Sequence, residues 1–116
     1  MDNLISSLQE SLRKFARERD WEQFHSPKNL AMALTVEAGE LQEIFQWLTE
    51  QQSFDLDVQR RQHVQDEMAD VLLYLCRLAD VLAIDLHAAA LAKLKRNAEK
   101  YPVCHVRGKA LKYTEY

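Results

Sequence analysis

Apolar residues recur at helical spacing in four separate stretches of this chain of 116 residues. We expect Asp2 to cap the first helix, Ser26 to cap the second with Pro27 at its first position, and Asp85 to cap the fourth, which Pro102 ends. Short connections between long amphipathic helices make neighbouring helices antiparallel. The pattern therefore predicts an all-α four-helix bundle with helices over residues 3–19, 27–50, 57–83 and 85–101.

The composition agrees with this fold class. The chain has only two Gly and two Pro, whereas an all-β fold would need many turn residues. Hydrophobic residues make up 47% and charged residues 28%, the balance of a globular protein. We expect a single domain over residues 1–116 in which 103–116 form an irregular tail.

Charge and hydropathy exclude several kinds of partner. A formal charge of −3 does not favour binding to nucleic acid polymers, which requires a basic surface. The longest apolar stretch, residues 71–84, is interrupted by Arg77 and Asp80 and is too short to span a bilayer. No secretory signal is visible at the start, and the two cysteines form no zinc motif. We therefore expect a cytoplasmic protein that binds neither membrane nor nucleic acid.

Four acids occupy unusual positions on the second and third predicted helices. At about 100° per residue, Glu37 lies in the middle of the apolar face of its helix and Glu40 lies one turn on, at the edge of that face. Glu67 and Asp70 repeat this arrangement on the next helix. Each helix thus carries ExxE or ExxD, with the first acid directed into the bundle.

An unpaired ionised carboxylate facing a core costs several kcal/mol, and converging carboxylates also repel one another. A bound cation offsets both effects. Several hard oxygen ligands suit Mg²⁺ or Mn²⁺, so the acids predict a divalent metal site.

Two other interpretations of the acids stay open. Glu37 and Glu67 could form internal salt bridges with Lys93 or Arg77. A ferritin-like di-iron centre also places carboxylates inside a helix bundle, but it needs ExxH on each of two helices. The chain has ExxH only at Glu22–His25, at a predicted helix break.

Helix four carries cations on one face. Lys93, Asn97 and Lys100 recur at four- and three-residue spacing, so they lie on the same side. A lysine can bind a phosphate and an asparagine can hydrogen-bond a sugar or phosphate oxygen. The alternative is an ordinary solvated face of an amphipathic helix.

The third helix is apolar on two sides. Besides the stripe around Glu67 it has a second stripe, made of Leu72, Leu75, Cys76 and Ala79. A helix with two apolar faces in so short a chain predicts packing on another subunit. A non-catalytic helical oligomer or partner-binding module is therefore an alternative function, although all four acids are intact.

Several motifs resemble the MazG-like all-α nucleoside triphosphate pyrophosphohydrolases. The shared part is the segment 37–43, with ExxE, followed by 67–71, with ExxD. The resemblance is closest to the dCTP pyrophosphatase branch, through the segments 20–30, 45–47, 101–103 and 112–114.

This resemblance implies Mg²⁺-dependent cleavage between the α and β phosphates of a nucleoside triphosphate, for nucleotide-pool cleansing, by a homodimer or a dimer-of-dimers tetramer. It implies a catalytic metal site made of Glu37, Glu40, Glu67 and Asp70, phosphate or sugar contacts from Lys93 and Asn97, and a base pocket walled by Trp21, His25, Trp47 and Tyr74. We expect deoxynucleotides, dCTP among them, to be preferred. Leu12 stands where some dCTP-preferring relatives carry a histidine, so we expect shallow selectivity among bases.

Overall fold

The computed structural model describes residues 3–110 and 112–115 of the chain, and every regular element in these residues is helical. The chain divides into two compact units, one ending at Ile84 and one beginning at Asp85. The first unit holds α1 (Leu4–Glu18), η1 (Glu22–Phe24), α2 (Pro27–Phe45), α3 (Glu50–Ser53) and α4 (Val58–Val81). The second holds α5 (Leu86–Lys100), α6 (Val103–Val106) and η2 (Tyr113–Glu115). The all-α prediction is confirmed. Whether both units belong to one domain stays a prediction.

Side-chain caps fix where the long helices begin. The Ser26 hydroxyl accepts a hydrogen bond from the amide of Asn29 at 3.1 Å, and Pro27 occupies the first turn, as predicted. Asp85 caps α5 in the same way. The first helix differs from expectation: its N-cap is Asn3, whose side chain accepts from the Ser6 amide at 2.9 Å, while Asp2 lies outside the described residues.

Two predictions about local structure differ from what the structure shows. The second helix ends at Phe45 rather than near Glu50, because Thr49 and Gln52 form a reciprocal capping box that starts the separate α3. The tail expected to be irregular contains two short helical segments, α6 and η2.

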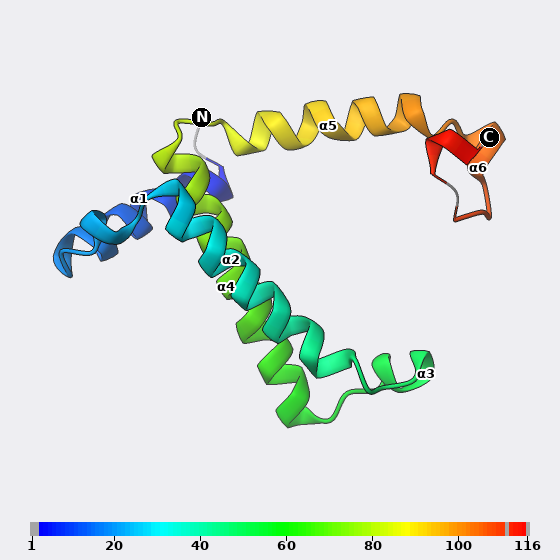
Figure 1. Ribbon diagram of the computed structural model, residues 1–116, viewed down its shortest axis with the longest axis horizontal. Helices are drawn as coiled ribbons and strands as arrows, with labels where there is room; N and C mark the ends of the chain where they lie inside the picture. The colour runs from blue at the N-terminus through cyan, green and yellow to red at the C-terminus, as the bar shows by residue number, and fades with distance from the viewer. Residues whose placement is uncertain (1–2, 111, 116) are drawn as a thin grey trace. The chain divides into compact units, whose positions relative to one another are not determined.

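The core of the first unit lies where α1 and α2 meet α4. Helices α2 and α4 run antiparallel side by side and form the most extensive contact, and α1 packs on α4 (Figure 1). Ala16 and Cys76 are completely buried, and the Gln9 amide donates to the carbonyl of Cys76 at 3.0 Å. Part of the second apolar stripe of α4 is therefore buried within the chain, so that stripe alone does not require another subunit.

The second unit is built around α5. Its Leu91 and Leu94 are exposed. Because α5 belongs to this unit, the predicted four-helix bundle stays a prediction. Among the described residues, none of the helices combines the length and apolar character needed to cross a membrane.

Both α1 and α4 end in a left-handed residue that is not glycine. Asp20 has φ 54° and Ala83 has φ 57°. After each, a backbone amide bonds back to the last turn: Trp21 to Ala16 at 2.9 Å and Ile84 to Ala79 at 2.8 Å. These are Schellman endings, which glycine favours because a Cβ is strained at positive φ. This ending of α1 reverses the chain, so that the backbone of Trp21 lies against the last turn of α1 and η1 begins at the next residue.

We predict that Ala83→Gly stabilises the protein by about 0.5–1 kcal/mol, because it relieves the strained left-handed alanine. Urea unfolding followed by circular dichroism measures the change. The control is Ala31→Gly inside α2, which should cost about 1 kcal/mol because glycine weakens a helix interior. Destabilisation by both substitutions would contradict the prediction.

Candidate functional site

Three of the four predicted acids come together between α2 and α4. Glu37 lies on α2, and Glu67 and Asp70 lie one turn apart on α4. One carboxylate oxygen from each lies within 4.8 Å of the others. The antiparallel pairing of the two helices brings the ExxE and ExxD motifs face to face, as their helical spacing predicts.

The acids of this cluster, Glu37, Glu67 and Asp70, are poorly compensated by protein groups. Glu67 is only 7% exposed, and its Oε2 and that of Glu37 are buried without a hydrogen-bond partner among the described residues. The pKa of Glu37 is raised above its ordinary value, mainly by the interaction with the Glu67 carboxyl and secondly by burial. The interaction with Glu40 lowers this pKa and so opposes part of the effect. Buried oxygens without partners are costly unless a ligand satisfies them.

This donor set fits a hard divalent cation. All three side chains offer carboxylate oxygens, and this group contains no histidine or cysteine. His63 belongs to the preceding turn of α4, and its Nε2 lies 3.4 Å from Oε1 of Glu67, not from the unpartnered Oε2. The acids therefore match Mg²⁺ or Mn²⁺ better than zinc or the ExxH pattern of a di-iron centre.

The alternative of an internal salt bridge with Arg77 was wrong. Arg77 instead lies 3.5 Å from Asp80 and donates from Nε to the Nδ1 of His25 at 3.1 Å. Arg77 lies about two turns beyond Asp70 on α4. Lys93 lies in the second unit, where repulsion from Lys100 lowers its pKa.

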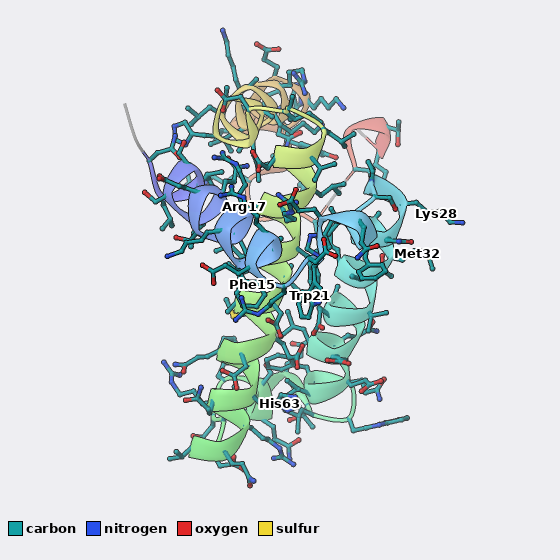
Figure 2. All side chains as sticks on the ribbon, turned by 90° about the vertical axis from the view of Figure 1, so that its left-hand side faces the viewer. Phe15, Arg17, Trp21, Lys28, Met32 and His63 are labelled. Atoms are coloured by element: carbon teal, nitrogen blue, oxygen red, sulfur yellow. The ribbon has the colours of Figure 1, made fainter. Side chains whose placement is uncertain are left out.

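A largely apolar pocket of about 420 Å³ adjoins Asp70. Of the predicted base-pocket residues, Trp21, His25 and Tyr74 line it, together with residues of α1 such as Leu8, Leu12 and Phe15. Trp21 packs edge-on against Phe15 with ring centroids 5.7 Å apart, and Figure 2 shows the two rings beside each other. The pocket offers aromatic faces next to the cluster of acids.

Glu40 and Trp47 belong to a second hollow of about 420 Å³, which Ile44, Leu48, Arg60 and His63 also line. Trp47 is 87% exposed there, so it does not wall the same pocket as Trp21. Lys93 and Asn97 lie on α5 in the second unit, and their roles stay predictions.

Sequence reasoning missed two pocket features. Leu73 and Arg77 line the pocket beside Asp70, whereas from the sequence Arg77 was considered only as an interruption of an apolar run and as a possible salt-bridge partner of the acids. The spacing could have revealed it, because residues seven apart lie on the same side of a helix and Arg77 follows Asp70 by seven positions.

We predict that the stabilising contribution of Glu37 to the metal-free protein decreases as the pH rises from about 5 to 8. A carboxyl whose pKa is higher in the folded than in the unfolded state stabilises the fold below its unfolded pKa, and that contribution is lost as the pH rises through the folded pKa. Glu37 is such a group. Melting temperatures in EDTA across this range measure the effect.

The matched variant is Glu37→Gln, which cannot ionise. Its melting temperature in EDTA should exceed that of the wild type at pH 8 and vary less with pH, and added Mg²⁺ should raise the wild-type value more. Identical pH profiles for the two proteins would contradict the prediction.

Comparisons with known proteins show which family the chain belongs to. Residues 32–115 match the model of the MazG-like family. The chain is 45% identical to the dCTP pyrophosphatase 1 of Rattus norvegicus and of Homo sapiens over 104 residues, which cover 88% of this chain and 61% of each relative. It thus spans about three fifths of the length of these curated relatives. The crystal structure of a pyrophosphatase from Archaeoglobus fulgidus matches with a TM-score of 0.81 and 39% identity, covering 88% of this chain and 95% of that one. The chain belongs to the MazG-like family.

Proposed function

We propose that the protein hydrolyses nucleoside triphosphates to the monophosphate and pyrophosphate, with Mg²⁺ as the cofactor and dCTP or other deoxynucleotides as substrates. The observation that carries this proposal is the pair of buried, unpartnered oxygens of Glu37 and Glu67 beside Asp70. Similarity to proteins named dCTP pyrophosphatase supports the substrate class. A role in cleansing the nucleotide pool follows from that substrate class.

The proposed metal ligands are Glu37, Glu67 and Asp70, with Glu40 one turn away on α2. When bound, Mg²⁺ neutralises charge on the triphosphate and lowers the pKa of a coordinated water. We assign acceptance of the water proton to Glu40, because this carboxylate interacts with Glu37 and lowers its pKa but lies outside the group of three.

The pocket beside Asp70 is the proposed site for the base and sugar. Trp21 and Tyr74 supply aromatic faces, and stacking contributes about 1–3 kcal/mol per base with little regard to base identity. An added 2′-hydroxyl pressed against this mostly apolar lining would lose water without replacement, which favours deoxyribose. Lys93 and Asn97 of α5 are proposed to contact the phosphates or the sugar.

We predict that purified protein with Mg²⁺ releases pyrophosphate from deoxynucleotides faster than from the matching ribonucleotides, and that EDTA abolishes the release. Each of Glu37→Gln, Glu40→Gln, Glu67→Gln and Asp70→Asn should lower kcat/KM by about 100-fold or more, since each removes a proposed metal ligand or, for Glu40, the proposed proton acceptor. A coupled pyrophosphate assay over dCTP, dTTP, dATP, CTP and ATP measures both effects.

The matched control is Asp66→Asn, which removes an exposed acid next to Glu67 on α4 that accepts a hydrogen bond from Gln62. It should keep near-normal turnover. Release of orthophosphate alone, or activity that survives EDTA, would exclude the proposed reaction. A folded protein that binds no nucleotide and releases nothing would favour the alternative, a non-catalytic helical oligomer or partner-binding module.

We also propose a homo-oligomer, a dimer or a dimer of dimers. Met32 and Val36 follow each other by one turn on α2, each 58% exposed, and Met68 on α4 is 56% exposed. In Figure 2 Met32 is labelled beside α2, on the side away from α4. Apolar side chains exposed in this way on two neighbouring helices are typical of a surface that another subunit covers.

We predict that the double substitution Met32→Glu and Val36→Glu shifts the protein to a smaller species in sedimentation velocity at micromolar concentration, because burying two charges at a subunit interface is unfavourable. The control is Lys14→Glu, a reversal of an exposed charge on α1, which should leave the sedimentation coefficient unchanged. A wild type that sediments as a monomer would refute the proposal.

A further inference from the structure

One nearly buried cation lies in the pocket beside Asp70. The side chain of Arg77 comes from α4 and is 11% exposed, yet it lines this otherwise mostly apolar space with Leu12 and Trp21. A buried guanidinium is costly unless its N–H groups are matched. The guanidinium nitrogens that have no partner within the protein therefore determine which ligand groups the pocket can bind.

Two of the three nitrogens are held by the protein. Nε donates to His25 at 3.1 Å, and Nη1 lies 3.5 Å from the Oδ2 of Asp80. Asp80 is itself fixed by Arg13 of α1, whose Nε and Nη2 donate to its two oxygens at 2.7 and 3.2 Å. For Nη2 of Arg77, the described residues provide no recorded partner. The guanidinium is thus fixed in direction, with donors left over.

His25 adds a second donor to the same pocket. Its Nδ1 accepts from Arg77, so a neutral imidazole carries its hydrogen on Nε2. The hydroxyls of Ser11 and Tyr74, which also line the pocket, can either donate or accept and do not discriminate. Asp70 is the remaining acceptor, and it belongs to the proposed metal site. The polar groups of fixed orientation in the pocket, those of Arg77 and His25, are therefore hydrogen-bond donors.

We propose that Arg77 determines base specificity by donating to two adjacent acceptors on the base edge, which among pyrimidine deoxynucleotides selects cytosine. Cytosine presents its ring nitrogen N3 next to the carbonyl O2, whereas uracil and thymine carry a hydrogen on N3. A planar guanidinium matches two adjacent acceptors, and a base with a donor there leaves an N–H facing an N–H. This inference rests on the proposed function, and it assigns to Arg77 the discrimination that Leu12 cannot supply.

The spacing on α4 agrees with this assignment. Arg77 follows Asp70 by seven residues, or about 10.5 Å along the helix axis. Tyr74 lies between them on the same side. A nucleotide whose phosphates bind at Asp70 would therefore lie along α4 with its ring over Tyr74 and its edge at Arg77.

The test compares nucleotides that differ only at the base edge. Binding of dCMP and dUMP is measured in EDTA by quenching of Trp21 fluorescence, in a Trp47→Phe background that leaves one tryptophan. The kcat/KM values of dCTP and dUTP are measured with Mg²⁺. We expect the wild type to prefer cytosine by about tenfold or more in both assays, and Arg77→Met to remove most of that preference.

Two further variants separate recognition from structure. Arg13→Met removes the other ion pair of Asp80 from outside the pocket, leaves the Arg77 guanidinium in place and should keep most of the cytosine preference. Arg77→Lys keeps the charge but loses the planar fork, so it should keep the melting temperature and lose most of the preference. Arg77→Lys also serves if Arg77→Met fails to fold.

Equal binding of dCMP and dUMP by the wild type would overturn the inference, as would an unchanged preference in Arg77→Lys or Arg77→Met. If pyrophosphate is released without such a preference, the inference fails and the proposed function stands. If dCMP is preferred through Arg77 but no triphosphate is cleaved, the proposed function fails and the inference stands.

Discussion

The organisation of this protein depends on the repulsion between carboxylates placed where two helices pack. Helices α2 and α4 bury apolar side chains against each other, yet Glu37 and Glu67 lie in that interface with oxygens that no protein group satisfies. The nearby Arg77 does not neutralise them, because it is held by His25 and Asp80, and His63 contacts only Oε1 of Glu67 in the described residues. This arrangement is unfavourable in the free protein and would become favourable when a cation binds. The energetic cost in the free protein and the proposed affinity for a metal ion therefore have the same origin.

The pocket is built from parts that depend on the end of α1. The left-handed Asp20 reverses the chain there, which brings Trp21 back against Phe15 and sends His25 toward α4. The contacts of Asp80 with Arg13 and Arg77 then tie α1 to α4 across the same region. The aromatic wall and the polar end of the pocket are therefore fixed by one connected set of interactions rather than by separate loops.

Much of this could be predicted from periodicity alone, because a charged residue in an apolar stripe is conspicuous. Glu37 and Glu67 were found in this way, and the structure brings them together with Asp70. Caps such as Ser26 were also predictable, since they act on residues three positions away. The early end of α2 was missed because a capping box at Thr49 outweighs the continuing apolar pattern. Arg77 was missed because its partners, His25 and Asp80, are brought to it only by the tertiary fold.

The distance between Asp70 and Arg77 along α4 has an evolutionary consequence. The residues that would carry the chemistry and the residue that would recognise the base stand two helical turns apart on one rigid element, so a change at one end leaves the other in place. Base preference can then diverge by single substitutions at position 77, without passing through inactive intermediates. An insertion of one residue between the two ends is different, because it rotates everything beyond it by about 100° and moves the side chain at position 77 away from the pocket. In this family we therefore expect the length of α4 between these positions to be more constrained than the identity of the residue at its far end.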